Sequence, residues 1–313
     1  MLLAGVYALA LHLEDSQRKP EPTGDHNARH QYDTTVDYDG HTYRLKSNLT
    51  TILLMGIDND TDSGLTVVNR DGGQADFLRL IVIDKTAKTI SQLAIDRDTM
   101  TPITILGVLG NRSGSRTMQI CLSHAFGNGR EQSCELTREA VENLLFGMRI
   151  DYYMSMNLNG VALINDALGG VTVTLEDDFP DPAMKKGETI TLQGRQAETF
   201  IRSRMSVGDG TNVGRMRRQQ QFIAQATDLL VKQMKQDENY VGQMYDTLSP
   251  SMVNNISKSR LILEAYDAQD YARPSLFQIA GEHKISEDGF MQFFADETKL
   301  QETVLQIFYD QLN

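Results

Sequence analysis

Five arginines lie close together in the segment from Phe200 to Gln221, which reads FIRSRMSVGDGTNVGRMRRQQQ. They are Arg202, Arg204, Arg215, Arg217 and Arg218. The chain as a whole carries 30 Lys and Arg against 42 Asp and Glu, a formal net charge of −12. Cations this close repel one another unless an anion lies among them. Guanidinium groups suit phosphate oxygens, so the segment predicts a phosphate or pyrophosphate ligand; a solvated basic helix face is the alternative.

The spacing of these residues indicates which of them share a side. If residues 200–204 are extended, Arg202 and Arg204 present their guanidinium groups in the same direction. A helix that begins at Arg215 places Gln219 one turn later, and its N-terminus adds a partial positive charge. We therefore predict that the anion is bound by Arg202, Arg204, Arg215 and Gln219. Helical spacing also puts Arg218 and Phe222 on the face of Arg215 and Gln219, and Arg217 on another face. Whether Arg218 joins the anion site is left undecided.

Two aspartates stand where expected strands begin or end. Asp58 follows the apolar run of residues 51–57, and Asp76 precedes the apolar run of residues 78–84. Carboxylates placed in this way can share Mg²⁺, which takes few protein ligands and keeps several waters. The alternative is that Asp58 caps a turn and that Asp76 is a solvated loop residue.

The motif IDRDT follows a third expected strand, residues 89–95. Strand alternation puts Arg97 on the face of Leu93 and Ile95, and Asp98 on the opposite face. An arginine that continues an apolar row is buried in an ion pair or lies at the mouth of an apolar pocket. Pairing of Arg97 with its own neighbouring aspartates is equally compatible with the motif.

The elements that position these residues mix strands with helices. An Asp-Gly pair within residues 36–46 predicts a β-hairpin. Further strands are expected at residues 51–57, 78–84, 89–95, 152–156, 171–175 and 188–192. Helical patterns occupy residues 136–145 and 158–168 and a long stretch that begins at Arg215. The fold class is therefore α/β or α+β, with a central mixed, largely antiparallel sheet flanked by helices.

The N-terminal residues differ from the rest. Residues 1–13 are apolar but too short to span a bilayer, so they read as the end of a membrane anchor or as an amphipathic helix. The polar residues 14–35 read as a stalk, and residues 36–313 as one domain. The sequence pI near 5.0 argues against nucleic acid as a partner.

Cys121 and Cys134 are the two cysteines of the chain. A disulfide between them would close a loop of about 14 residues, worth roughly 3 kcal/mol. With the N-terminus read as an anchor, we expect this disulfide; two buried free thiols are the alternative.

The chain resembles the LytR–CpsA–Psr (LCP) family over roughly residues 50–235. The motifs, in chain order, are ILLMGID, GGQADFLRLIVIDKTAKTISQLAIDRDT, ICLSHAFGNG, IDYYMSMNLNGVALINDALGGVTVTL, LQGRQAETFIRSR and GRMRRQQQFI. The resemblance implies a sheet flanked by helices, with a hydrophobic tunnel for a lipid and a C-terminal helical part at residues 236–313. It also implies an extracytoplasmic enzyme with a single N-terminal membrane anchor, as expected in Gram-positive bacteria.

The resemblance implies a Mg²⁺- or Mn²⁺-assisted phosphotransferase. Such an enzyme moves a phosphorylated glycopolymer, of the teichoic acid or capsule type, from a polyprenyl-pyrophosphate carrier to peptidoglycan. Matched motif by motif, the metal ligands are Asp58 and Asp76. The pyrophosphate contacts are Arg97, Arg202, Arg204, Arg215 and Gln219, and Asp98 or Asp76 is a candidate proton acceptor.

The chain departs from the family pattern at three positions. Gln74 stands where the motif around Asp76 begins with arginine, Ile95 replaces a proline before Arg97, and Gln119 stands where lysine is common. A lipid-pyrophosphate phosphohydrolase would use the same residues, so it stays open beside the transferase. The three changes also keep open a non-catalytic lipid-carrier or cell-wall binding protein. A glycosidase is disfavoured, because carboxylates among arginines stay ionised whereas a general acid needs a raised pKa.

Overall fold

The computed structural model describes residues 35–58, 72–107, 109–157, 159–203, 207–208, 212–274 and 276–312. Contacts divide the chain into two units, Met1–Leu45 with Gln311–Asn313, and Lys46–Asp310. The predicted anchor and almost all of the predicted stalk lie outside the described residues. In the part of the chain that is described, no helix is both long enough and apolar enough to cross a membrane.

The first unit contains the predicted Asp-Gly hairpin. Strands β1 (Thr35–Tyr38) and β2 (His41–Leu45) pair antiparallel. Asp39 and Gly40 form the turn with φ of 49° and 77°, the left-handed region that this type of turn requires.

The second unit is built around a six-stranded sheet in the order β11-β8-β3-β4-β5-β12. Its strands are β3 (Leu49–Asp58), β4 (Gln74–Asp84), β5 (Thr89–Ile95), β8 (Tyr152–Asn157), β11 (Met252–Asn254) and β12 (Phe277–Gln278). The β3–β4, β4–β5 and β8–β11 pairs are antiparallel, whereas β3–β8 and β5–β12 are parallel. The predicted mixed, largely antiparallel sheet is confirmed.

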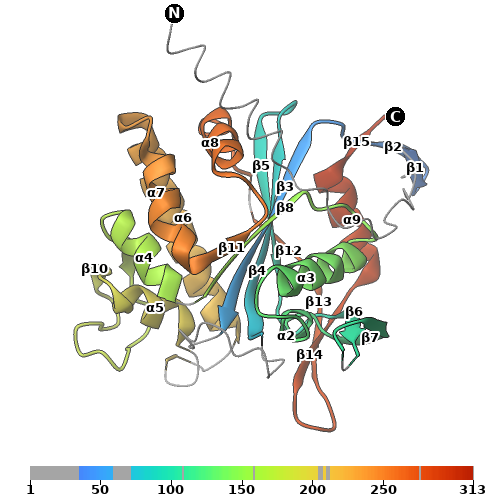
Figure 1. The fold of residues 1–313 in the computed structure, drawn as a ribbon, viewed down its shortest axis with the longest axis horizontal. Coiled ribbons are helices and arrows are strands. Elements are labelled where there is room, and N and C mark those ends of the chain that lie inside the picture. The colour runs from blue at the N-terminus through green and yellow to red at the C-terminus, as the bar shows by residue number, and fades with distance from the viewer. Residues whose placement is uncertain are drawn as a thin grey trace, which may run out of the picture. The chain divides into compact units, whose positions relative to one another are not determined.

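Helices cover both faces of this sheet, as Figure 1 shows with the sheet almost edge-on. One side carries α4 (Asn159–Ala167), α5 (Arg195–Arg202), α6 (Asn212–Gln236), α7 (Tyr240–Leu248) and α8 (Lys258–Asp267). The other carries α2 (Leu122–Ala125), α3 (Glu131–Leu144) and α9 (Glu297–Phe308), which β15 (Tyr309–Gln311) follows. The short 3-10 turn η1 (Ser249–Ser251) joins α7 to β11.

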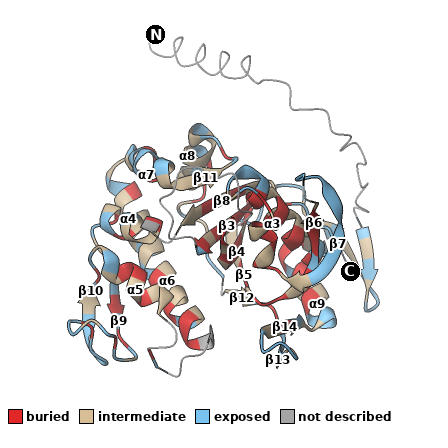
Figure 2. Ribbon diagram, turned by 60° about the horizontal axis from the view of Figure 1, so that its bottom comes forward, coloured by how far each residue is buried: buried red, intermediate tan, exposed pale blue. Residues whose placement is uncertain are grey.

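The central strands are buried on both faces, which explains their nearly continuous apolar runs. Leu53, Leu80 and Leu93 are fully buried, and Figure 2 shows the buried residues concentrated in β3, β4 and β5. Strand register shows which side chains share a face. Leu54 lies opposite Arg79, and Ile81 lies opposite Gln92. Because Arg79 and Ile81 are two residues apart on β4, all four side chains are on the same face.

Three smaller antiparallel pairs complete the second unit. They are β6 (Met100–Leu106) with β7 (Arg112–Gln119), β9 (Thr172–Thr174) with β10 (Thr189–Thr191), and β13 (Gly281–Ile285) with β14 (Met291–Ala295). The sequence predicted β9 and β10 only. Strand β7 reads RSGSRTMQ and is largely exposed, so it lacks the apolar alternation that identifies a half-buried strand.

The condition under which Arg202 and Arg204 share a direction, an extended backbone at residues 200–204, is not met. Helix α5 continues through Arg202, and Ser203 is its C-cap. The helix is strongly amphipathic, with Ala197 and Phe200 fully buried, so tertiary packing favours the helical conformation up to this point. Arg202 therefore projects from a helix end, and Arg204 lies outside the described residues.

Candidate functional site

Arg97 and Asp76 form the centre of the candidate site. Asp76 lies in β4, and Arg97 lies in the turn that directly follows β5, the antiparallel neighbour of β4. Arg97 Nη1 donates to Asp76 Oδ1, and Arg97 Nε lies 3.5 Å from Asp98 Oδ1. Burial acts to lower the pKa of Arg97, but its interactions with Cys121 and with the carboxylates of Asp76 and Asp98 outweigh burial and raise that pKa above its ordinary value. Arg97 is thus held as a cation.

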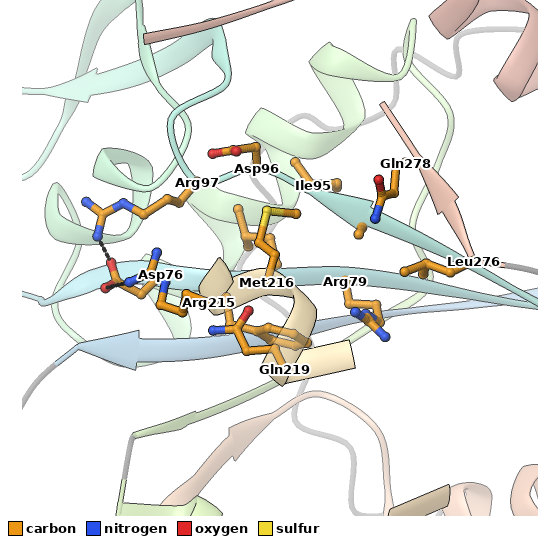
Figure 3. Close-up of a pocket in the computed structure, with 13 residues that line it drawn as sticks. Asp76, Arg79, Ile95, Asp96, Arg97, Arg215, Met216, Gln219, Leu276 and Gln278 are labelled. Atoms are coloured by element: carbon orange, nitrogen blue, oxygen red, sulfur yellow. Dashed lines mark hydrogen bonds and ion pairs between the residues drawn. The ribbon is translucent and has the colours of Figure 1, made fainter. Parts of the chain in front are cut away.

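Helix α6 brings a second arginine to Asp76. Arg215 is buried, and its Nη1 lies 3.6 Å from Asp76 Oδ2. Gln219 follows one turn later, and its Nε2 donates to the carbonyl of Ile201 over 3.4 Å. Figure 3 shows Arg97 and Asp76 facing each other, with Arg215 and Gln219 beside them. The helical spacing that predicted Arg215 and Gln219 to share a face is confirmed.

Asp58 joins the site through the end of α5. It is the last residue of β3, and its Oδ1 accepts from Arg202 Nη2 at 2.9 Å. Arg202 Nη1 donates to Glu198 Oε1 at 3.1 Å, a contact within α5 that the sequence analysis did not consider. The structure therefore brings together Asp58, Asp76, Arg97, Arg202, Arg215 and Gln219 on β3, β4, the β5 turn, α5 and α6.

The remaining two arginines of the cluster have structural contacts. Arg217 is 59% exposed and pairs with Glu176 at 2.9 Å, so this ion pair lies outside the group of residues around Asp76. Arg218 is buried; its Nε donates to the carbonyl of Phe200 at 3.0 Å and its Nη2 donates to the carbonyl of Ser203. Arg218 therefore satisfies carbonyls at the C-terminal end of α5 rather than pointing to a ligand.

An apolar cavity of about 370 Å³ lies beside the cluster, between the sheet and helices α4, α6 and α7. Its walls include Leu54, Ile81, Met154, Phe222, Ile223 and Leu230. Asp76, Arg202, Arg215 and Gln219 line the same cavity. This size is within the range of small-molecule sites, about 300–1,000 Å³. A ligand with a charged group at the cluster would have room for an apolar group beside it.

A model of the LytR_cpsA_psr family matches residues 12–307. The chain belongs to the LytR–CpsA–Psr (LCP) family. Named relatives include two proteins called polyisoprenyl-teichoic acid–peptidoglycan teichoic acid transferase TagU. The one from Bacillus licheniformis is 32% identical over 201 residues, 63% of this chain and 55% of that protein. The one from Bacillus subtilis is 32% identical over 176 residues, 55% and 49% respectively. The matched part of the chain spans about half the length of these relatives.

Solved structures show the same LCP fold. Protein gbs0355 from Streptococcus agalactiae superposes with a TM-score of 0.67 at 23% identity, covering 84% of this chain and 90% of that one. TagV from B. subtilis superposes with a TM-score of 0.62 at 22% identity, covering 84% and 96%. A structure of TagT bound to LI-WTA has a TM-score of 0.61 at 22% identity, covering 83% and 89%.

Two residues that the sequence analysis did not assign hold Arg97 in this LCP protein. Gln74 Oε1 accepts from Arg97 Nη2, and the same nitrogen lies 3.4 Å from Cys121 Sγ. Gln74 stands at the position where the family motif has arginine, so the departure replaces a cation with an acceptor for the neighbouring cation. The sequence did contain one indication of this role. Gln74 lies two residues before Asp76 on the same strand, so the two side chains are on the same face.

The predicted disulfide is not formed, and both cysteines are free, buried thiols. Cys121 contacts Arg97 and lies 3.8 Å from Gln74 Oε1, whereas Cys134 lies on the buried face of α3 with a hydrogen bond to Ser155. The two thiols therefore contact different residues. Burial raises the pKa of the Cys121 thiol to about 11, so the group is protonated at neutral pH.

The turn that carries Arg97 is held from a distant part of the chain. Asp96 Oδ1 accepts from the Asp98 backbone N–H at 2.9 Å, and Asp96 Oδ2 lies 3.0 Å from His283 Nε2 on β13. Asp98, the predicted proton acceptor, has a buried side chain, and its carbonyl accepts from the Phe293 N–H on β14. No pattern in the sequence indicated the contribution of β13 and β14.

The two predicted metal ligands lie at the end of the sheet on adjacent strands, where Asp58 is opposite Gln74 in register. Among the described residues, no group of three or more His, Cys, Asp and Glu side chains is placed to hold a metal ion. Two carboxylates are nevertheless what Mg²⁺ uses when substrate phosphates and waters complete its coordination. Both Asp76 oxygens lie near arginines, whereas Asp58 Oδ2 has no partner within the described chain. Asp58 and Asp76 are therefore the carboxylate donors that this end of the sheet offers to a cation.

Proposed function

We propose that this LCP protein transfers a phosphorylated glycopolymer from a polyprenyl-pyrophosphate carrier to peptidoglycan at the extracytoplasmic face of the membrane. The observation that carries the proposal is the cluster of Arg97, Arg202 and Arg215 around two aspartates beside an apolar cavity, which Asp76, Arg202 and Arg215 line. The names of the two TagU relatives support the teichoic-acid class of polymer.

The arginines supply the electrostatic part of the reaction. The three guanidinium groups come from the turn after β5, from the end of α5 and from α6. The buried sheet and the two helices fix their positions. Phosphoryl transfer depends mainly on positioning and charge neutralisation, and donors that are fixed before substrate binds need no reorganisation. An acceptor hydroxyl attacks the glycan phosphorus and loses its proton to solvent water. The bond from that phosphorus to the bridging oxygen breaks, and polyprenyl phosphate leaves with its charge neutralised by the arginines.

Asp58 and Asp76 are proposed to hold Mg²⁺ or Mn²⁺. A divalent cation there would add positive charge on the pyrophosphate oxygens and help to orient them. Asp76 would keep its contacts with Arg97 and Arg215, which fix the carboxylate in place.

Asp98 is proposed to orient Arg97 rather than to take a proton from the acceptor. Its side chain is buried and lies 3.5 Å from Arg97 Nε, and its backbone is bonded on both sides, to Asp96 Oδ1 and to the Phe293 N–H. A proton acceptor must come within hydrogen-bond reach of the attacking hydroxyl, and the buried position of Asp98 does not favour such an approach.

The apolar cavity is proposed to receive the lipid part of the carrier. Its walls are mainly apolar side chains of the sheet and of α4, α6 and α7, and its lining includes Asp76, Arg202 and Arg215 of the cluster. Hydrocarbon removed from water gains roughly 25 cal/mol per Å² buried. A carrier with its pyrophosphate at the cluster can place its nearest isoprene units there.

A transfer assay with matched arginine variants tests the proposed function. Arg202→Ala and Arg97→Ala should each lower transfer of labelled glycan to peptidoglycan oligomers roughly 100-fold, as loss of a charge-stabilising donor does elsewhere. Arg217→Ala is the control, because Arg217 is on the same helix as Arg215 but is exposed and paired with Glu176. Chelation of divalent cations should also lower transfer.

The outcomes separate the proposed function from its alternatives. Arg202→Ala should lower the free energy of unfolding by no more than about 2 kcal/mol. Arg202 and Asp58 are 35% and 43% exposed, and the largely buried Glu198 keeps Arg195 at 4.0 Å. Full transfer by Arg97→Ala and Arg202→Ala would refute the assignment of the site. Release of free phosphorylated glycan without attachment to peptidoglycan would identify a hydrolase.

A further inference from the structure

Arg79 is a buried cation on the wall of the apolar cavity. It lies in β4 within the run LRLIVID and is only 3% exposed. The cavity-facing side chains around it come from Leu54, Phe77, Ile81 and Gln92 on the same face of the sheet. An arginine in the middle of a buried strand is costly unless its charge and its donors are satisfied.

The protein satisfies only part of the Arg79 guanidinium. Nη1 donates to Gln92 Oε1 at 3.0 Å and to Gln220 Oε1 at 2.9 Å, and the group lies 5.4 Å from the centre of the Phe77 ring. Both glutamines are neutral. Within the described chain no carboxylate pairs with Arg79, and its buried Nε has no acceptor. Burial lowers the pKa of Arg79 to about 10, so the guanidinium remains charged at neutral pH.

The position of Arg79 differs from that of the arginine–aspartate cluster. Figure 3 shows its guanidinium directed away from the Arg97–Asp76 pair, with Gln219 between them. The unused edge of the guanidinium, Nε with Nη2, is the edge that binds carboxylate or phosphate in pairs of hydrogen bonds. A purely hydrocarbon ligand in the cavity would bury this charge without an acceptor.

We propose that Arg79 makes the cavity a binding site for a single-chain anionic amphiphile, whose phosphate or carboxylate is held by Arg79 and whose chain lies against the apolar walls. The inference rests on the cavity of the proposed function and adds a second anion-binding point to it. The anion has two possible sources, which share this chemistry. It is either the phosphate of the carrier nearest its lipid, or the head group of a separate amphiphile.

Calorimetric titration of the full chain tests the inference, with dodecyl phosphate and dodecanol as probes below their micellar concentrations. Wild type should bind dodecyl phosphate at least roughly 10-fold more tightly than dodecanol, because a hydrogen-bonded charge pair is favoured in an apolar site. Arg79→Met should abolish this preference and leave dodecanol binding unchanged. Arg97→Ala is the matched control, since it removes an arginine of the cluster, and it should keep the preference.

A second probe, farnesyl diphosphate, distinguishes the two sources. Weaker binding of this probe in both Arg79→Met and Arg97→Ala identifies the carrier phosphate as the anion at Arg79. Weaker binding in Arg97→Ala alone identifies a separate amphiphile. Equal binding of dodecyl phosphate and dodecanol by wild type, or loss of the preference in Arg97→Ala but not in Arg79→Met, would overturn the inference.

The experiment stands apart from the transfer assay. It contains no glycan and no acceptor, so a protein without transferase activity still gives a clear answer. Active transfer with no preference for the alkyl anion would refute only the role of Arg79. If Arg79→Met does not fold, Arg79→Gln replaces it, because glutamine removes the charge and keeps a polar group. The ratio of dodecyl phosphate affinity to dodecanol affinity is then compared between Arg79→Gln and Arg97→Ala.

Discussion

Arg97 shows how single residues set the chemistry of the site. Its guanidinium contacts Asp76, Gln74 and Cys121 together with Asp98, so each edge of the fork has a partner. A side chain with three polar acceptors and a thiol around it has little rotational freedom. The arginine is therefore oriented before a ligand binds, which lowers the entropic cost of binding.

The buried thiols give the protein a definite pH dependence. Burial raises the pKa of Cys134 to about 12, opposed by a hydrogen bond to Ser155, whereas an unfolded thiol ionises near about 8.5. Between these values the folded protein keeps a proton that the unfolded chain releases, so stability falls as pH rises. Above about pH 9 we expect Cys134 alone to lower the free energy of unfolding by about 1.4 kcal/mol per pH unit.

Urea unfolding of wild type and Cys134→Ala between pH 8 and 10.5 measures this effect. The variant loses a constant amount of packing energy but should show a shallower decline with pH. Other groups that titrate in this range, including lysines and tyrosines, are common to both proteins and cancel in the comparison. Parallel declines in the two proteins would contradict the assignment.

At this scale the sequence predicted the identity of the site residues better than their partners. Asp58, Asp76, Arg97, Arg215 and Gln219 were all named from motif and spacing, and the structure brings them together. Gln74 and Cys121 were not assigned to Arg97, because a neutral amide and a thiol are ordinary residue types without a charge pattern. The disulfide was wrong because loop length says nothing about which way two side chains point.

At the scale of elements, the site depends on the junction between α5 and α6. Arg218 on α6 reaches the carbonyls of Phe200 and Ser203 at the end of α5, lies 3.9 Å from Asp177 and packs over the Phe179 ring. Carbonyls at a helix C-terminus have no partner within the helix, so this side chain completes α5. The same junction positions Arg202 and Arg215.

Neighbouring arginines on α6 provide a matched test of this junction. Arg218→Ala should lower the free energy of unfolding by about 2–4 kcal/mol, because two buried carbonyls lose a charged donor. Arg217→Ala should change it by no more than about 0.5 kcal/mol, because its ion pair with Glu176 is exposed. Chemical denaturation of the two variants measures both values, and similar losses would show that the junction is not specific to Arg218.

Elements with strong periodicity were predicted well, including β3, β4, β5, β8, α4 and α6. The end of α5 was not, because the choice between helix and strand at residues 200–204 depends on packing of Phe200 against a core that local sequence does not reveal. The β13–β14 hairpin was missed for a similar reason. All five residues of β13 are exposed, so no apolar alternation marks it.

At the scale of the whole second unit, that hairpin supports the turn around Arg97. His283 contacts Asp96, the Phe293 N–H donates to the carbonyl of Asp98, and Gln119 Nε2 donates to the carbonyl of Met291. A segment near the C-terminus therefore holds a turn from the first third of the chain. The sequence gives no local indication of such a contact, because its residues are far apart.

Loss of the histidine should weaken this support. His283→Ala leaves the buried Asp96 carboxylate without one of its partners, and we expect a loss of about 1–3 kcal/mol in the free energy of unfolding. Lys284→Ala is the control, because Lys284 is exposed and its contacts within the described chain are weak: an ion pair with exposed Glu282 and a ring contact, at 5.5 Å, with exposed Phe294. Equal unfolding midpoints for the two variants would exclude a supporting role for His283.

The distance along the chain between Asp96 and His283 has a consequence for biosynthesis. The two residues are 187 positions apart. At about 5–20 residues per second, a ribosome needs roughly 10–40 s to make the intervening chain. During that interval β3, β4 and β5 can already pair, but the arginine turn lacks its C-terminal support. The β3–β4–β5 part of the sheet can therefore pair early, whereas the edge strands β11 and β12 and the arginine turn reach their final state only after most of the chain has been made.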